Sequence, residues 1–366
     1  MLSIMFKKRK LVILFLCTIG IAVVILLPKG IIFLSSIKSS INKETRFFYI
    51  KESSSLQRLA DRLVKEGFIA DRAAFISVGE YKGLTTKEIA IGKYEIKPST
   101  SFRTLLNGFR INSKGNGNGE VEVNLKFNNC NTLNDLVKKV SKSLLIDSTK
   151  LIALLTSSET LSKYGFTLEQ FPTMFIPNTY KFYYDTNENE FVERMAREFK
   201  SFWTTERMKK IKSIGLNSPS DVVTLASIVY SEQSIVPDEW PTIAGLYLNR
   251  LSKGIRMQSD PTFKFCWGDK LKGVQRLLFV HRDIDCPYNT YKINGLPPGP
   301  ICFPSTKVVD AVLNRKKVAY IYMCAKPDYS YRHNFAIEGA EHSKNAKSFQ
   351  NWLALEIKKK SKKIIK

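Results

Sequence analysis

The segment from Asp221 to Gln233 has a helical pattern of apolar positions that ends in an acid. Leu225, Val229 and Glu232 fall at i, i+4 and i+7, so they share one face of a helix. An acid held against apolar neighbours loses hydration, which disfavours its charged form and raises its pKa. Such an acid can keep a proton near neutral pH and act as a general acid. The alternative is that Glu232 lies near the helix end and turns into water.

The start of this helix is marked by residues typical of helix N-termini. Ser218 stands at the N-cap position, Pro219 at the first helical position and Asp221 in the first turn. Further helices are predicted from periodicity at 133–140, 151–155 and 190–203, and strict alternation predicts a strand at 121–127.

A small mixed module precedes that strand. The pattern predicts a strand at 46–51, a helix capped by Ser53 or Ser54 and ended by Gly67, a helix at 71–81, a strand at 93–96 and a helix from Ser101. Strand, helix, helix, strand is the order found in small carbohydrate-binding LysM-like modules, which is an analogy of fold only. A spacer domain is an equal alternative.

The N-terminus predicts a membrane anchor. Four basic residues, Lys7 to Lys10, precede an uncharged apolar run from Leu11 to Leu27 that Pro28 closes. A helix that spans a bilayer needs about 17–25 apolar residues, and preceding positive charge favours a cytoplasmic N-terminus. A cleaved signal peptide is the alternative, but no A-x-A-like site follows. We therefore expect a single-pass protein of the cytoplasmic (inner) membrane whose remaining chain is extracytoplasmic or periplasmic.

The formal net charge is strongly basic, +24. Such a charge is compatible with a solvated lysine-rich surface, nucleic acid, an anionic membrane surface or an acidic polymer. An extracytoplasmic location argues against nucleic acid as a partner.

Cysteine and histidine spacing predicts neither a disulfide framework nor a metal site. Of six cysteines, Cys17 lies in the predicted anchor and the other five carry no C-x-x-C spacing. We interpret those five as core residues, although disulfides are permitted outside the cytoplasm. The three histidines show no H-E-x-x-H or similar spacing, so no metal or other cofactor is expected.

Several segments after Glu232 are rich in amides, hydroxyls and flat rings. These groups can hydrogen-bond sugar hydroxyls and stack on the apolar faces of sugar rings. Each segment alone is equally typical of an ordinary turn or loop. The candidates for holding a glycan are Gln258, Asp260, Asn289, Thr290, Tyr291, Pro298 and Asn334.

Taken in order, these segments resemble a known family. The strings ASIVYSE (226–232), LNRL (248–251), MQSDPT (257–262), YNTYKINGLPPGPI (288–301) and HNF (333–335) are similar to those of the endolytic murein transglycosylases, the YceG-like or MltG family. The segment ending at Tyr180 is similar to another family segment, which adds Tyr180 to the glycan-binding candidates. Two departures are Tyr230, where the family often has a second acid, and Asn178, where it has an acid.

The resemblance implies a lyase that cleaves the β-1,4 bond between N-acetylmuramic acid and N-acetylglucosamine in peptidoglycan. Glu232 matches the family's catalytic glutamate and would protonate the glycosidic oxygen, while the C6 hydroxyl of the same muramic acid closes a 1,6-anhydro ring. Such an enzyme would terminate or trim nascent glycan strands. Peptidoglycan strands are the implied substrate, and wall synthases are a further expected class of partner.

The expected fold class is α+β, with a transmembrane helix, a LysM-like module and a larger mixed α/β catalytic domain whose lysozyme-like helix carries the acid. The predicted parts are a cytoplasmic tail (1–10), an anchor (11–28), a LysM-like module (44–112), a connecting part (119–215), a catalytic core (216–354) and a basic tail (355–366). Two alternatives stay open: a non-catalytic wall-binding anchor protein, and a glycoside hydrolase that uses Asp260 beside Glu232.

Overall fold

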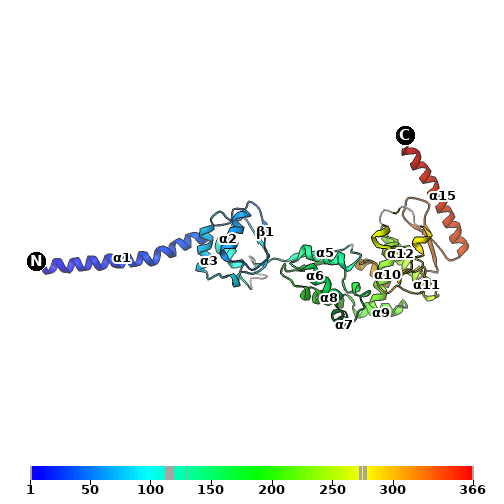
Figure 1. Ribbon diagram of the computed structural model, residues 1–366, viewed down its shortest axis with the longest axis horizontal. Coiled ribbons are helices and arrows are strands. Elements are labelled where there is room, and N and C mark those ends of the chain that lie inside the picture. Colours follow the sequence, from blue (N-terminus) through cyan, green and yellow to red (C-terminus); the bar gives the residue numbers. More distant parts are fainter. Residues whose placement is uncertain (1, 112–118, 129, 272–273, 275–277, 365–366) are drawn as a thin grey trace. The chain divides into compact units, whose positions relative to one another are not determined.

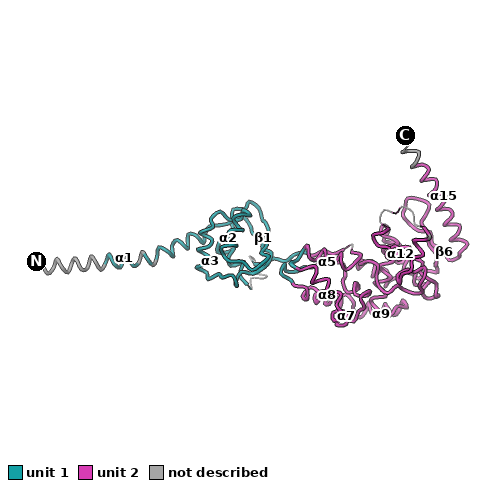
Figure 2. Tube along the Cα trace, viewed as in Figure 1, with its two compact units in different colours: residues 1–124, 143–145, 181–186 teal, residues 125–142, 146–180, 187–366 magenta. Residues whose placement is uncertain are grey.

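The computed structural model describes residues 2–111, 119–128, 130–271, 274 and 278–364. Contacts divide the chain into two compact units (Figures 1 and 2). Unit 1 comprises residues 1–124, 143–145 and 181–186, and unit 2 comprises residues 125–142, 146–180 and 187–366. Helices and short two-stranded sheets make up both units, so the expected α+β class is confirmed.

Unit 1 contains a strand, two helices and a second strand in chain order. Its elements are α1 Leu2–Ile37, β1 Arg46–Ile50, α2 Leu56–Lys65, α3 Arg72–Tyr81, η1 Thr86–Glu88, β2 Gly92–Ile96 and α4 Phe102–Gly108. Strands β1 and β2 are antiparallel, with Arg46 opposite Ile96 and Ile50 opposite Gly92. Buried apolar side chains from these strands and from α2, α3 and α4 form one core.

The helices of unit 1 begin where their capping residues can bind free backbone N–H groups. Asp71 accepts a hydrogen bond from the backbone of Ala74, and Ser101 accepts one from Thr104. The expected cap of α2 at Ser53 or Ser54 is wrong, because Ser55 accepts the bond from Arg58. Ser54 is buried and donates instead to the carbonyl of Glu52, so its hydroxyl is already engaged.

Within the side chains that the structure describes, no helix carries a stretch long and apolar enough to cross a membrane. Part of the predicted anchor lies outside those side chains, namely positions 11–14, 19, 22, 23 and 25. The predicted tail at 1–10 and positions 360–366 lie outside them as well.

Unit 2 is built from helices around a buried central helix, α10. Two strands, β3 Val123–Phe127 and β4 Asn178–Phe182, pair with each other in a short sheet, and residues 125–127 and 178–180 of these strands belong to unit 2. The helices before the central one are α5 Leu133–Ser143, α6 Ser148–Thr156, α7 Ser158–Tyr164, η2 Phe171–Met174, α8 Glu188–Phe202 and α9 Thr205–Ser213. The remaining elements are α10 Pro219–Glu232, η3 Pro237–Glu239, α11 Trp240–Ser252, α12 Asp260–Trp267, η4 Gly268–Leu271, α13 Phe279–Arg282, α14 Thr306–Leu313, β5 Tyr322–Ala325, β6 His333–Ala336 and α15 Gly339–Ile364.

Helix α10 is the centre of the unit 2 core. Its side chains from Val222 to Val229 are all buried, and they pack with apolar residues of α11 and α14 in one cluster. A helix that is buried on every side is fixed in position by its surroundings. Any group at its C-terminal end is therefore held in place by the whole core.

The expectation that all five cysteines beyond the predicted anchor are unpaired core residues is wrong for two of them. Cys266 in α12 and Cys286 form a disulfide. Cys130 and Cys302 are buried free thiols, and Cys324 is half-buried in β5. The two cysteines are 20 residues apart in the sequence, so no short spacing motif predicts their pairing.

Gly299 tests the packing of the proline-rich loop at 296–300. A Cβ atom at this position would lie 1.9 Å from the carbonyl oxygen of Glu169, a backbone atom that cannot turn away. We expect Gly299→Ala to destabilise the protein by about 1–3 kcal/mol, the usual cost of overpacking. Urea unfolding would measure this loss.

Gly339→Ala is the matched control, because the nearest atom to its added Cβ is the hydroxyl of Tyr322 at 3.7 Å. A Gly299→Ala variant as stable as Gly339→Ala would show that the loop does not pack against Glu169.

Candidate active site

Glu232 is the last residue of α10, and the position of that helix is fixed at both ends. At the start, Ser218 and Asp221 form a capping box in which each side chain accepts the other's backbone N–H. At the end, the backbone N–H of Gln233 donates to the carbonyl of Val229 at 3.1 Å. Glu232 is half-buried, and its carboxyl group meets residues from two later segments.

Two hydroxyl groups donate to the same carboxyl oxygen of Glu232. The phenol of Tyr247, from α11, lies 2.7 Å from Oε1, and the hydroxyl of Ser259, just before α12, lies 2.5 Å from it. Neither Tyr247 nor Ser259 is exposed beyond 2%. Within the described part of the chain, Oε2 receives no hydrogen bond. One oxygen is thus anchored, and the other remains available to a ligand.

Burial raises the pKa of Glu232 above its ordinary value, because desolvation penalises the carboxylate. The hydrogen bonds from Ser259 and Tyr247 oppose this shift, since both stabilise the charged form. The negative charge of Asp260 raises the pKa and the charge of His333 lowers it, as smaller effects. Desolvation is the largest of these causes, so the carboxyl group holds its proton to higher pH than an exposed glutamate would.

Glu232 lies on a cavity of about 430 Å³ in unit 2. This size falls within the range of small-molecule and cofactor sites. Polar side chains that line the cavity beside Glu232 include Arg250, Gln258, Asp260, Tyr291 and His333. Three of the candidates from the sequence, Gln258, Asp260 and Tyr291, are therefore gathered with Glu232.

The side-chain amide of Gln258 has an orientation that Arg250 fixes. The guanidinium of Arg250 donates from Nη2 to Gln258 Oε1 at 2.6 Å, which leaves the Nε2 donors of the amide for another partner. Gln258 has a φ of 53°, a left-handed conformation that is uncommon for residues other than glycine. The carbonyl of Thr290 accepts its backbone N–H.

Asp260 and Tyr291 form a pair on the cavity wall. The Tyr291 phenol donates to Asp260 Oδ1 at 2.6 Å. Burial and this hydrogen bond raise the pKa of Tyr291, so the phenol stays protonated. The pair therefore brings a second carboxylate into the cavity that holds Glu232.

Asn289 and Thr290 occupy a different place from the one expected for glycan-binding residues. Both are fully buried, and neither is among the described residues that line the cavity. The Asn289 amide donates to the carbonyls of Arg282 and Ile284 and so holds a loop closed. Thr290 Oγ1 accepts the backbone N–H of Ser259 at 2.9 Å. These residues support the wall of the site from within.

Three other candidates lie apart from the cavity lining. Tyr180 is buried in β4, donates to the carbonyl of Ile176 and stacks on Phe127. Pro298 is exposed on its loop, and Asn334 is half-buried in β6.

The sequence did not identify several residues that complete the site. Tyr247 and Ser259 bind Glu232, Arg250 orients Gln258, and Glu239 binds the ring of His333 at 2.8 Å. Their contacts cross between elements, so the only sequence signal was that Arg250 and Ser259 lie within the strings LNRL and QSDP. No cluster of His, Cys, Asp and Glu suited to a metal ion occurs among the described residues.

Comparisons with known proteins agree on one family. The model of the YceG-like family matches residues 48–348. The endolytic murein transglycosylase of Bacillus subtilis is 34% identical over 181 residues, 47% of this chain and 48% of that protein. The endolytic murein transglycosylase of Streptococcus pneumoniae (strain D39) is 24% identical over 302 residues, 75% of this chain and 53% of that protein. The chain thus spans about half the length of the curated relatives it matches.

A solved structure shares the fold. The crystal structure of a yceG-like protein from Listeria monocytogenes superposes with a TM-score of 0.52 at 22% identity, covering 83% of this chain and 99% of that chain. At this identity the likeness concerns the fold alone.

The raised pKa of Glu232 predicts how Glu232→Gln changes stability with pH. A carboxyl group whose folded pKa lies above its unfolded value stabilises the protein below the unfolded value, and this contribution is lost as pH rises through the folded pKa. Glutamine does not ionise, so the Glu232→Gln variant does not lose stability in this way as the pH rises. Relative to the wild type, the variant should therefore gain free energy of unfolding from about pH 4 to about pH 8, by about 1.4 kcal/mol for each unit of pKa shift.

Urea unfolding of both proteins at the two pH values measures this gain. Glu159→Gln, at an exposed position of α7, is the control for the loss of a glutamate that is in contact with water. A flat difference for Glu232→Gln would contradict a buried, protonated acid.

Proposed function

The chain belongs to the YceG-like family, and we propose that it is an endolytic lytic transglycosylase that cleaves the glycan strands of peptidoglycan. The observation that carries the proposal is the carboxyl group of Glu232, desolvated on a ligand-sized cavity with one oxygen bound by two hydroxyls. The names of the relatives support the substrate class.

Glu232 would act as the general acid. Its proton would lie on Oε2, since Oε1 accepts both hydroxyl hydrogen bonds. Transfer of that proton to the oxygen between N-acetylmuramic acid and N-acetylglucosamine would break the glycosidic bond. The hydroxyls of Tyr247 and Ser259 would then stabilise the new carboxylate, because both favour the charged form. Attack of the C6 hydroxyl on C1 would give the 1,6-anhydro end, and the Glu232 carboxylate would take the proton that this hydroxyl releases.

Gln258 and Asp260 would position the glycan. The free Nε2 donors of Gln258 suit the carbonyl oxygen of an N-acetyl group or a sugar hydroxyl. The carboxylate of Asp260 would stabilise the positive charge that develops at C1 as the bond breaks. Tyr291 would orient that carboxylate through its hydrogen bond.

We also propose that unit 1 includes a LysM-like module and that the enzyme is held at the cytoplasmic membrane. The order β1, α2, α3, β2 with antiparallel strands supports the module, whose role is either glycan binding or spacing. The charges at Lys7 to Lys10 ahead of an uncharged run support the anchor. The Cys266–Cys286 disulfide fits an oxidising, extracytoplasmic compartment.

A glycoside hydrolase is the second candidate, because Asp260 shares the cavity with Glu232. Such an enzyme would use two carboxylates and release ordinary reducing ends. The products of the reaction therefore separate the two activities.

Product analysis after Glu232→Gln tests the proposed function. The change keeps the shape of the side chain and removes the proton donor, so release of anhydro-ended fragments from purified peptidoglycan should fall by a factor on the order of 10²–10⁴. Mass spectrometry of the fragments measures both rate and end type, with Glu159→Gln as the control. Undiminished anhydro products would mean that Glu232 is not the acid, and reducing ends from the wild type would favour the hydrolase.

A further inference from the structure

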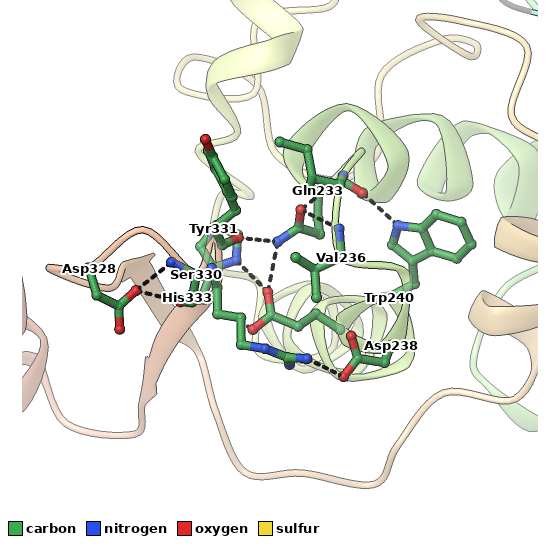
Figure 3. A network of polar contacts seen from close by, with 11 residues as sticks. Gln233, Val236, Asp238, Trp240, Asp328, Ser330, Tyr331 and His333 are labelled. Carbon is green, nitrogen blue, oxygen red and sulfur yellow. Dashed lines mark hydrogen bonds and ion pairs between the residues drawn. The ribbon is translucent and has the colours of Figure 1, made fainter.

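The carboxamide of Gln233, next to Glu232 in sequence, has an orientation fixed by hydrogen bonds (Figure 3). Its Oε1 accepts the backbone N–H groups of Ile235 at 3.1 Å and Val236 at 3.0 Å. The amide nitrogen must therefore be the other atom, and it donates to Glu239 Oε2 at 2.9 Å and to the carbonyl of Tyr331 at 2.8 Å. The side chain is buried, so no water competes for these bonds.

Glu239 is buried and accepts from three donors. Besides Gln233 Nε2, it accepts the backbone N–H of His333 at 3.0 Å on Oε1 and bonds the ring of His333 through Nδ1 at 2.8 Å on Oε2. A carboxylate is an acceptor only, so Nδ1 of His333 must carry a proton. In the neutral imidazole the second nitrogen, Nε2, is then an acceptor.

His333 lines the same cavity as Glu232. Its Nδ1 edge is bonded to Glu239, which lies behind it, so the opposite edge with Nε2 is the one left for the cavity. Within the described part of the chain, Nε2 has no hydrogen-bond partner. An imidazolium at His333 lowers the pKa of Glu232, so protonation of the ring is felt by Glu232.

We propose that His333 is a second catalytic residue, a general base that takes the proton of the C6 hydroxyl, and that Glu239 is its positioning residue. The inference rests on the proposed function, in which Glu232 is the acid. It replaces the scheme in which the Glu232 carboxyl group gives the first proton and its carboxylate receives the second.

The step balances with two groups. Glu232 Oε2 gives its proton to the glycosidic oxygen, and the C1–O4 bond breaks with its electron pair on that oxygen. The C6 oxygen attacks C1 and forms the O6–C1 bond, while its proton passes to His333 Nε2. The product state contains the Glu232 carboxylate and the His333 imidazolium. Loss of the imidazolium proton to solvent and uptake of one by Glu232 restore the enzyme.

The buried carboxylate of Glu239 stabilises the imidazolium that this step forms. A carboxylate bonded to Nδ1 fixes the tautomer and favours the charged ring, the same role that an aspartate has beside the histidine of serine proteases. Gln233 in turn holds Glu239 in place.

Other titratable groups line the same cavity and contribute to the pH dependence of the rate. The charged or chargeable groups are Glu232, Arg250, Asp260 and His342. The neutral ones, phenols and a thiol, are Tyr247, Tyr291, Tyr322 and Cys324. Of these, Asp260 is engaged by Tyr291 and His342 stacks on Tyr322, which leaves His333 as the histidine held by a carboxylate.

The pH dependence of kcat/KM of the full-length enzyme tests the inference. Activity would need Glu232 protonated and His333 neutral, so the wild type should lose activity both at high and at low pH. His333→Gln should be slower by a factor on the order of 10²–10⁴ and should lose the decline at low pH. In His333→Ala, added imidazole should restore part of the rate, because the cavity can hold a free base.

Neighbouring variants separate this role from a structural one. Glu239→Gln should lower the rate, since an amide no longer favours the imidazolium. Asp238 precedes Glu239 in the sequence and forms an exposed ion pair with Arg332. Asp238→Asn removes that ion pair and should leave the rate and the pH profile unchanged. Binding of each variant to undigested glycan strands shows whether the site is intact.

Two results would overturn the inference. One is a wild-type rate and profile in His333→Gln; the other is a slow His333→Ala that binds strands normally but gains nothing from imidazole. If Glu232→Gln is inactive in the same assay, the proposed function stands in both cases. An active Glu232→Gln that still forms anhydro ends would instead defeat the proposed function itself.

Discussion

The desolvation of one carboxyl group is the constraint on which the site depends. Glu232 stands at the end of a helix whose side chains from Val222 to Val229 are buried, so the helix cannot shift to expose it further. Removing a carboxylate from water costs several kcal/mol, and two hydroxyl hydrogen bonds recover part of that cost. The result is a carboxyl group that holds its proton to higher pH than an exposed glutamate does.

Consecutive side chains at the end of α10 connect two parts of unit 2. Glu232 faces the cavity, whereas Gln233 bonds Glu239 and the carbonyl of Tyr331, in the turn before β6 (Figure 3). The same helix end fixes Glu232 and Gln233. Because Gln233 binds Glu239 and Glu239 binds His333, this helix end positions both the Glu232 carboxyl group and the His333 ring. A change that moves the end of α10 would displace both groups together.

Local sequence predicted the central helix well, because its signals are local. The apolar pattern and the capping residues at Ser218 and Asp221 give α10 within a residue of its observed bounds. The partners of Glu232 are different in kind, because Tyr247 and Ser259 lie 15 and 27 residues further along the chain. Such contacts depend on how α11 and α12 pack on α10, which no periodicity records.

The Asn-Thr-Tyr string shows why residue type alone misplaces binding residues. Amides and hydroxyls that could hold a sugar can equally satisfy backbone groups in a tight loop, and burial decides between the two. Thr290 bonds the backbone of Ser259, and Ser259 bonds Glu232, so the string reaches the acid through one intermediate residue. Tyr291 alone of the three lines the cavity. The string is therefore tied to Glu232 through the Ser259 hydroxyl, whose hydrogen bond lowers the pKa of that carboxyl group.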